Sequence, residues 1–147
     1  MVYSVTLIPG DGIGPEVAEA TRRVLDATGV AFNWEVCDAG STALEKHGDL
    51  IPESTLESLR RNKVGLKGPI TTPIGSGFRS VNVALRQALK LYANLRPART
   101  MKGVQAPFDN IDLVIVRENL EGMYSGIEFD TGTPEAAEMI SAINEIG

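Results

Sequence analysis

The sequence predicts an α/β protein, in which strands and helices alternate along the chain. Two observations support this class. Short runs rich in Val, Ile and Leu, such as residues 5–9, end in turns that contain glycine or proline, as strands do. Between these runs, apolar residues recur at a spacing of three or four, as in amphipathic helices. The 147 residues, of which 43% are hydrophobic, suffice for about one domain with a core.

The expected strands are short and are placed by their β-branched residues. We expect strands over residues 5–9, 32–37, 64–68, 91–95 and 112–117. The last of these is expected to be buried, because its central residues are uniformly apolar.

The first helix is expected to start near Pro15, because a first helical turn does not need the N–H that proline lacks. Gly29 is a natural stop. The inward face of this helix is expected to hold Val17, Ala20, Val24 and Thr28.

Three further helices are expected. One begins at residues 51–53, and another covers residues 80–90. In the tail, Thr133 is a candidate N-cap for a helix with Pro134 in its first position and with Ala137, Ile140 and Ile143 inward. Residues 46–49 indicate a polar turn, and residues 69–78 a long loop. A change in composition near residues 97–110 predicts a boundary that divides the chain into 1–98 and 99–147.

Charge and composition exclude several classes of function. The net charge of -5 gives no general attraction for nucleic acid or for an anionic membrane. No apolar stretch is long enough to span a bilayer and no signal peptide is evident, which predicts a cytoplasmic protein. Cys37 is the one cysteine, expected to be a buried structural thiol, and His47 is the one histidine, expected at the surface rather than as a catalytic base.

The glycine-rich turn at residues 10–14 invites comparison with a dinucleotide-binding Rossmann turn. It follows an expected strand and opens an expected helix. The Rossmann spacing requires a third glycine at the position of Pro15, and the acidic residue expected about 20 positions later is poorly matched. The turn is therefore interpreted as one that lets strand and helix pack closely.

The most informative stretch lies between residues 71 and 99, with a second block at residues 117–124. Asn82 and Arg86 are four residues apart, so they share one flank of the expected helix. Ser80 sits at the start of that helix, where free N–H groups favour an anion. Arg96 and Arg117 are each expected at the end of a strand, where open α/β sheets place their ligands.

Three arginines that converge would repel one another unless an anion neutralised them, and each guanidinium can grip a carboxylate through two N–H groups. The pattern therefore predicts a site for a small polyanion, such as a di- or tricarboxylate. Phosphate is a weaker alternative, because the chain has no Walker-type glycine–lysine loop. The competing interpretation is that each arginine is solvated and that Tyr124 is a packing or interface residue.

Several long segments resemble the β-decarboxylating dehydrogenases, the family of isocitrate, 3-isopropylmalate and homoisocitrate dehydrogenases. The matching segments are residues 8–16, 67–86, 91–97 and 116–128. The resemblance implies a partial isopropylmalate-dehydrogenase-like fold that is not a Rossmann fold. It would comprise the N-terminal half of the large domain over residues 1–98 and the start of the small or clasp domain over residues 99–147.

The resemblance implies roles for the polar residues of both blocks. Ser80 and Asn82 would read the third substituent of the substrate, and their polar character favours the carboxylate of isocitrate over an alkyl group. Arg86, Arg96 and Arg117 would hold the carboxylates.

A catalytic acid and a cofactor contact are implied in the same way. Tyr124 would protonate the enol carbon after decarboxylation. Thr71, Thr72 and Asn82 would contact the nicotinamide end of the cofactor. In some bacterial relatives the serine that matches Ser80 is phosphorylated, and a phosphate there would repel the substrate carboxylate.

The implied reaction is the oxidative decarboxylation of isocitrate to 2-oxoglutarate, a step of the tricarboxylic acid cycle. The cofactors would be NAD+ or NADP+ and Mg2+ or Mn2+, with the metal acting as a Lewis acid and its ligands mostly outside this chain. The implied assembly is a homodimer or a pairing with a full-length subunit. Two alternatives stay open: a non-catalytic tricarboxylate-binding or regulatory subunit, and an isopropylmalate or homoisocitrate dehydrogenase.

Overall fold

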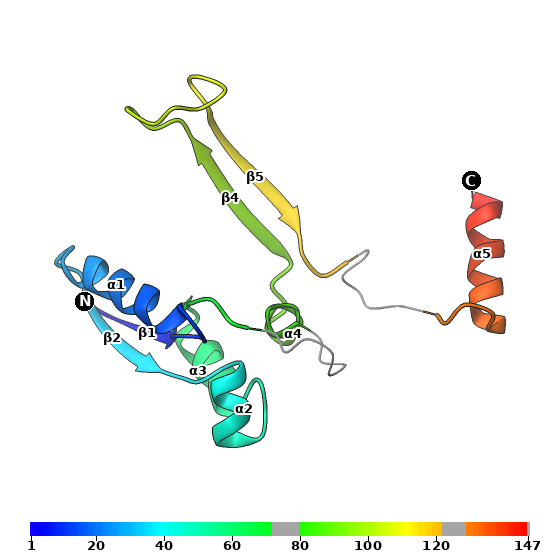
Figure 1. The fold of residues 1–147 in the computed structure, drawn as a ribbon, viewed down its shortest axis with the longest axis horizontal. Coiled ribbons are helices and arrows are strands. Elements are labelled where there is room, and N and C mark those ends of the chain that lie inside the picture. Colours follow the sequence, from blue (N-terminus) through cyan, green and yellow to red (C-terminus); the bar gives the residue numbers. More distant parts are fainter. Residues whose placement is uncertain (72–79, 122–128, 147) are drawn as a thin grey trace.

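The computed structural model describes residues 1–71, 80–121 and 129–146. Strands and helices alternate through the first half of the chain, and a two-stranded ribbon and a final helix follow (Figure 1). The predicted α/β class is confirmed. None of the helices in the described ranges is long and apolar enough to cross a membrane.

A parallel sheet of three strands forms the centre of the N-terminal region. Its strands are β1 (Val2–Ile8), β2 (Ala31–Val36) and β3 (Gly65–Lys67), in the order β2-β1-β3. The central strand β1 ends in buried residues, since Val5, Leu7 and Ile8 are at most 5% exposed. This position fits the β-branched and apolar residues at the end of the strand, because a central parallel strand is covered on both faces.

Helix α1 (Gly14–Asp26) connects β1 to β2, and the prediction of its inward face is wrong. Gly14 and Ala18 are the buried residues of the helix, whereas Val17 is 45% and Val24 is 68% exposed. The small residues at positions 14 and 18 let the helix approach the rest of the chain closely, so this stripe faces inward instead of the valine stripe. Sequence periodicity cannot choose between two stripes that are both apolar.

Two helices lie between β2 and β3. The helix α3 (Glu53–Asn62) matches its prediction, whereas α2 (Ser41–His47) was expected only as a polar turn at its end. The signal for α2 is weak because the helix has seven residues, of which Ala43 alone is buried. His47, its last residue, is half exposed on its side chain, as expected, and Cys37 is only partly buried.

The hydrophobic core joins α3 to α4 (Val81–Ala88). Leu56, Val81 and Leu85 form its buried centre, and further apolar side chains pack around them. Buried polar groups attach α3 to the sheet: the hydroxyls of Thr6 and Ser58 are hydrogen-bonded at 2.7 Å. Both side chains are about 1% exposed or less, and this hydrogen bond satisfies two groups that would otherwise be costly to bury.

The strands β4 (Ala93–Arg99) and β5 (Asp112–Glu118) form a separate antiparallel ribbon. Residues 114–116 were expected to be buried, and they are 51–67% exposed, so this prediction is wrong. The ribbon projects away from the three-stranded sheet and its helices (Figure 1). The expected division after residue 98 would cross this ribbon, because residue 98 lies inside β4 and pairs with Leu113.

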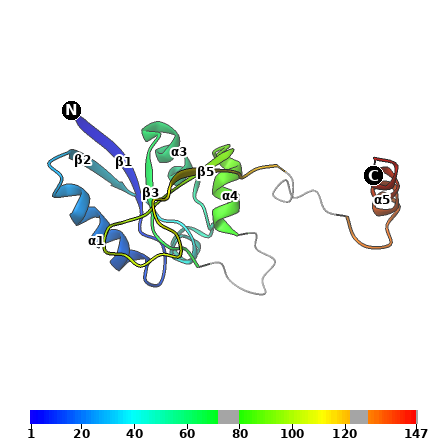
Figure 2. The same ribbon diagram turned by 90° about the horizontal axis from the view of Figure 1, so that it is seen from above.

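The helix α5 (Pro134–Ile146) lies apart from the other elements (Figure 2). Thr133 is its N-cap, as predicted, because its hydroxyl accepts a hydrogen bond from the N–H of Ala136 at 3.2 Å. The expectation that Ile140 and Ile143 point inward is wrong, since they are 58% and 59% exposed. They lack a partner surface within the described residues.

The substitution Leu56→Ala tests the position of the core. Leu56 is 8% exposed, and its loss leaves a cavity beside Val81 and Leu85. We expect the free energy of unfolding to fall by about 2–5 kcal/mol in urea titrations followed by circular dichroism. Leu95→Ala is the matched control, because Leu95 is 65% exposed, and it should change stability by less than about 0.5 kcal/mol. Equal losses in the two variants would contradict this core.

Candidate functional site

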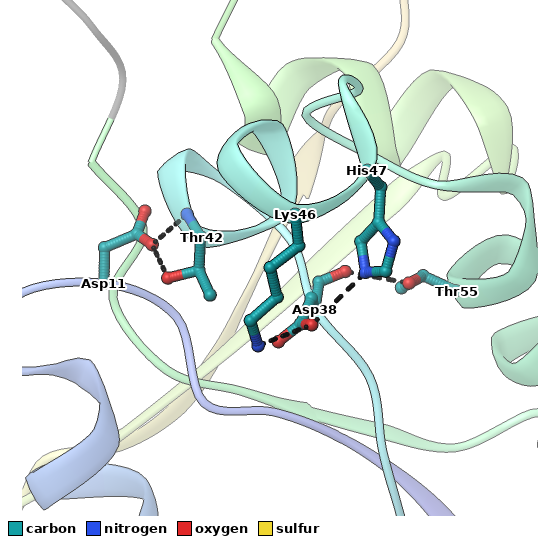
Figure 3. A network of polar contacts seen from close by, with 6 residues as sticks. All are labelled: Asp11, Asp38, Thr42, Lys46, His47 and Thr55. Carbon is teal, nitrogen blue, oxygen red and sulfur yellow. Dashed lines mark hydrogen bonds and ion pairs between the residues drawn. The ribbon is translucent and has the colours of Figure 1, made fainter.

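The carboxylate of Asp11 joins three segments that are distant in the sequence. It accepts a hydrogen bond from the N–H of Ser41 at 3.1 Å. Thr42 donates two more, from its N–H at 3.1 Å and from its hydroxyl at 3.0 Å (Figure 3). A fourth hydrogen bond comes from the N–H of Thr71 at 3.3 Å. The turn after β1, the start of α2 and the segment after β3 are therefore held at one carboxylate.

The same place requires close contact between backbones. Gly10 has a φ of +80°, a conformation that L side chains rarely adopt, and a Cβ there would collide with the carbonyl of Pro69. A Cβ at Gly68 would collide with the carbonyl of Pro9. The N–H of Asp11 donates to the carbonyl of Pro69 at 2.9 Å. The glycine-rich turn thus packs a strand end against residues 68–71, whereas the sequence indicated only close packing of strand and helix.

The charge of Asp11 is stabilised by this arrangement. Burial raises the pKa of the Asp11 carboxyl, but the backbone and side-chain hydrogen bonds from Thr42 and Ser41 outweigh it. The net result is a pKa below the ordinary value of 3.8. Asp11 is 9% exposed and remains ionised at neutral pH.

A second aspartate fixes the other end of α2. Asp38 accepts from Lys46 at 3.0 Å, lies 3.4 Å from Nε2 of His47, and its carbonyl accepts from the Thr55 hydroxyl at 2.8 Å (Figure 3). The hydrogen bond from Lys46 lowers the pKa of Asp38 against the opposing effect of burial, with help from His47. His47 therefore makes a contact with Asp38 at the protein surface.

The predicted cofactor residue Thr71 follows directly from the Asp11 junction. Its N–H is bound to Asp11, and its side chain is exposed. Thr72, predicted beside it, lies outside the described residues, as does most of the expected loop 69–78. Asp11 therefore positions the backbone of Thr71.

Helix α4 carries three of the predicted substrate residues. Ser80 is its N-cap, and the Ser80 hydroxyl makes no capping hydrogen bond to the helix. Asn82 and Arg86 are partly buried and line the same groove, which has a volume of about 870 Å³ and lies between α4 and β3. The prediction that these two residues share one flank of a helix is confirmed.

Lys67 belongs to this groove, and sequence reasoning assigned it no role. It is the last residue of β3 and lines the groove with Asn82 and Arg86. Burial lowers the pKa of Lys67, and the positive charge of Arg86 lowers it further. Its position at the end of a parallel strand was the available signal, since ligand sites gather at that end. The groove therefore has two cations near one another before any ligand binds.

The ribbon carries the other two predicted arginines. Arg96 was expected at a strand end, and this is wrong, because it lies in the middle of β4. Arg117 is near the end of β5, as expected. Arg96 pairs with Ile115, and Asn94 pairs with Arg117, so the two arginines are diagonal neighbours on one face of the ribbon. The two arginines are neighbours because of the antiparallel register of β4 and β5, and not because both stand at strand ends.

Backbone hydrogen bonds connect the end of α4 to this ribbon. The N–H of Leu91 donates to the carbonyl of Arg86 at 2.9 Å. The N–H of Asn119 donates to the carbonyl of Tyr92 at 3.1 Å. The end of α4, the start of β4 and the end of β5 thus meet. Arg86 and Arg117 belong to these hydrogen-bonded backbone segments.

The predicted residues fall into two groups in the structure. Asn82 and Arg86 line the groove with Lys67, while Arg96 and Arg117 share a face of the ribbon. Tyr124 lies outside the described residues. Within residues 1–71, 80–121 and 129–146, no three His, Cys, Asp or Glu side chains gather as a metal site. The arrangement can bind an anion, and the described part provides no metal centre.

Comparisons with known proteins identify the family of the chain. Residues 4–146 match the family model described as isocitrate/isopropylmalate dehydrogenase. The chain is 46% identical to the mitochondrial isocitrate dehydrogenase [NAD] catalytic subunit 5 of Arabidopsis thaliana, over 94% of this chain and 37% of that protein. It is 45% identical to the isocitrate dehydrogenase [NADP] of Haloferax volcanii, over 96% of this chain and 35% of that protein.

A solved structure shows the same fold. The isocitrate dehydrogenase of Methylococcus capsulatus superposes with a TM-score of 0.80 and 52% identity, over 90% of this chain and 39% of that one. The family match and the superposition define an α/β protein of the dehydrogenase type. The chain belongs to the isocitrate/isopropylmalate dehydrogenase family. It spans between 35% and 39% of the length of these three relatives.

The pH dependence of stability tests the Asp11 junction. The folded-state pKa of Asp11 is lowered, so its contribution is present above the ordinary value of 3.8 and is lost as the pH falls through the folded pKa. We expect Asp11→Asn to reduce the free energy of unfolding at pH 7 by about 1.5–3 kcal/mol, because hydrogen bonds to a charged acceptor are replaced by weaker ones. The difference from the native chain should shrink below pH 3.8.

Asp38→Asn is the matched control for this measurement. It removes an exposed ion pair with Lys46, which should cost about 1 kcal/mol or less. An Asp11→Asn effect that is no larger than that of Asp38→Asn, or that persists at acid pH, would contradict the proposed junction.

Proposed function

We propose that this chain provides the part of an isocitrate dehydrogenase that binds the carboxylates of isocitrate. The observation that carries the proposal is the convergence of cations at the end of α4, in a chain of the isocitrate/isopropylmalate dehydrogenase family. The parent reaction would be the oxidation and decarboxylation of isocitrate to 2-oxoglutarate. The chain spans 37% of the Arabidopsis thaliana relative and 39% of the solved structure, and the whole reaction is proposed on the strength of the family.

The arginines would hold the carboxylates by paired N–H donors. Arg86 is partly buried beside Lys67, so two positive charges in the groove favour an anion that neutralises both. Arg96 and Arg117 present two further guanidinium groups on one face of the ribbon. A tricarboxylate has enough charge and enough oxygen atoms to satisfy such a set, whereas a neutral ligand would leave the cations in mutual repulsion.

The choice of isocitrate over isopropylmalate rests on Ser80 and Asn82. Ser80 makes no capping hydrogen bond, and Asn82 lines the groove, so both can bond the third carboxylate of isocitrate. An alkyl group at that position would leave these polar groups unpaired, which costs about 1–3 kcal/mol for each buried group. An isopropylmalate dehydrogenase is the alternative, because the family comprises both activities.

The described residues do not form a complete binding site for the cofactor or for the metal. NAD+ or NADP+ would accept the hydride from isocitrate, and the two relatives named above use one each by their names. Thr71 and Asn82 are the described residues proposed to contact the nicotinamide end, and they do not make a complete dinucleotide site. The described residues also do not fit a Mg2+ or Mn2+ site. Tyr124 as the acid and a homodimer remain predictions from the sequence.

A non-catalytic subunit is the second candidate function. It is favoured by the combination of a cation set suited to binding with the lack of a metal cluster in the described ranges. Such a subunit would bind a tricarboxylate, or pair with a full-length relative, without turning it over. Binding and turnover therefore have to be measured separately.

Isocitrate should raise the melting temperature of the 147-residue chain, since a ligand that binds only the folded state stabilises it by mass action. Arg86→Ala should abolish the shift, because it removes a guanidinium from the groove. Arg23→Ala on α1 removes an exposed arginine far along the chain from the groove and should leave the shift unchanged. Differential scanning fluorimetry measures all three. Equal shifts in the two variants would leave the groove without a role.

Turnover separates the two candidate functions. With Mg2+ and either NAD+ or NADP+, the chain alone should not oxidise isocitrate, because its described residues offer no metal site. Reduced cofactor is followed by its absorbance, and a full-length isocitrate dehydrogenase serves as the positive control. Cofactor reduction that depends on isocitrate and disappears in Arg86→Ala would show that the chain is catalytic by itself.

A further inference from the structure

The short helix α2 is attached to the rest of the described chain mainly by polar contacts. Among its residues Ala43 alone is buried, and an alanine side chain buries a single methyl group. The neighbouring helix α3, in contrast, buries Leu56 in the hydrophobic core. Because the free energy of apolar burial scales with the area buried, packing contributes far less to the attachment of α2 than to that of α3.

Two aspartates bind the two ends of α2, and neither of them belongs to the helix (Figure 3). In the first turn, Asp11 accepts hydrogen bonds from the N–H and the hydroxyl of Thr42. In the last turn, Asp38 accepts from Lys46 at 3.0 Å and contacts His47. The helix is therefore attached through a carboxylate at each end.

Each aspartate is itself fixed to another element. The N–H of Asp11 donates to the carbonyl of Pro69 at 2.9 Å. The carbonyl of Asp38 accepts from the hydroxyl of Thr55 on α3 at 2.8 Å, and Thr55 is 2% exposed. Both aspartates are thus held by contacts that do not involve α2.

The segment from Gly40 to Gly48 is a distinct structural unit. Both glycines have a positive φ, of +83° and +75°, and a Cβ on Gly40 would collide with the Asp11 carboxylate. Inside the segment, the N–H of Leu44 donates to the carbonyl of Gly40 at 3.0 Å, and the N–H of Gly48 to that of Leu44 at 2.9 Å. A helix of seven residues is not stable alone in water, so these hydrogen bonds last only while α2 is docked.

The Asp11 carboxylate is shared between α2 and Thr71. One of its oxygens, Oδ2, accepts from the N–H of Ser41 at 3.1 Å and from the N–H of Thr71 at 3.3 Å. Undocking of α2 removes the donors at Ser41 and Thr42 that orient the carboxylate, so the contact with Thr71 weakens at the same time. Coupling between two places requires an element with two states that both places bias, and α2 is such an element.

We propose that α2 docks and undocks as a unit, and that the Asp11 carboxylate couples this step to the position of Thr71. A change at Asp38, at the far end of α2, then loosens Thr71 as well. By the reciprocity of coupled equilibria, a ligand that holds Thr71 in place stabilises docked α2. The inference goes beyond the proposed function, and its test contains no ligand, so that either proposal can fail while the other stands.

The test measures amide hydrogen exchange by NMR in the full 147-residue chain. The N–H groups of Leu44 and Gly48 report on α2, and that of Thr71 reports on the contact with Asp11. The N–H of Leu59 reports on the neighbouring helix α3. In the native chain, the two groups of α2 should exchange at least about tenfold faster than that of Leu59, because they open locally.

The variant Asp38→Asn weakens the contact at the far end of α2. Exchange should speed up together at the two groups of α2 and at Thr71, by up to about fivefold, as for the loss of an exposed ion pair. Exchange at Leu59 should not change. The matched control is Glu19→Gln, which removes an exposed ion pair of the same 3.0 Å length on α1 and should leave all four groups unchanged.

The variant Asp11→Asn removes the shared carboxylate itself. It should speed up exchange at α2 and at Thr71 by about tenfold or more, because several hydrogen bonds to a charged acceptor are weakened. Circular dichroism establishes that each variant is folded, and Asp38→Asn carries the test alone if Asp11→Asn is not.

Three results would overturn the proposal. The first is faster exchange at Leu44 and Gly48 in Asp38→Asn with no change at Thr71, which would show that α2 opens without coupling. The second is an equal change at Leu59, which would show that α2 opens only when the whole chain unfolds. The third is an effect of Asp38→Asn no larger than that of Glu19→Gln, which would show that Asp38 does not hold the helix.

Discussion

The carboxylate of Asp11 is the contact on which the candidate site depends. It belongs to the turn after β1 and accepts hydrogen bonds from two other segments, the start of α2 at Ser41 and Thr42 and the N–H of Thr71. The close contact of Gly10 and Gly68 with neighbouring carbonyls leaves no room for side chains there. The three segments are therefore fixed against one another, and Thr71 is placed where the chain leaves the sheet toward α4.

The chemistry of the site follows from two kinds of backbone geometry. A helix places Asn82 and Arg86 on one flank, beside the end of a parallel strand that supplies Lys67. An antiparallel ribbon places Arg96 and Arg117 on one face, next to the end of α4. The cations belong to three local structures, β3, α4 and the ribbon, and hydrogen bonds at Leu91 and Asn119 connect the end of α4 with the ribbon. An anion with several carboxylates suits such a set because it can neutralise cations held by separate elements.

The sequence predicted the fold class, the flank of α4 and the identity of the family well, because these depend on local spacing and on long motifs. It failed where two alternatives look alike locally. The valines of α1 and the stripe at Gly14 and Ala18 are both apolar, and only packing decides which one is buried. Arg96 was placed at a strand end because the antiparallel pairing of β4 with β5 is not local information.

Lys67 and Asp11 illustrate a different limit. Their roles come from contacts with residues that are 19 to 60 positions away, such as Arg86 and Thr71, and no local pattern signals them. The apolar residues of β5 and α5 were expected to be buried and are exposed in a chain that spans 35% to 39% of the relatives compared. Apolar pattern predicts that a surface is to be covered, and it does not say which polypeptide covers it.

The most direct measurement of the central claim is the map of isocitrate contacts on the chain by NMR. The side-chain signals of the Arg86, Arg96 and Arg117 guanidinium groups and of the Asn82 amide should shift together, with one common binding curve. Arg22, Arg23 and Arg61, which lie on other surfaces of the chain, should not respond. Shifts confined to those other arginines, or separate curves for the groove and the ribbon, would contradict a single tricarboxylate site.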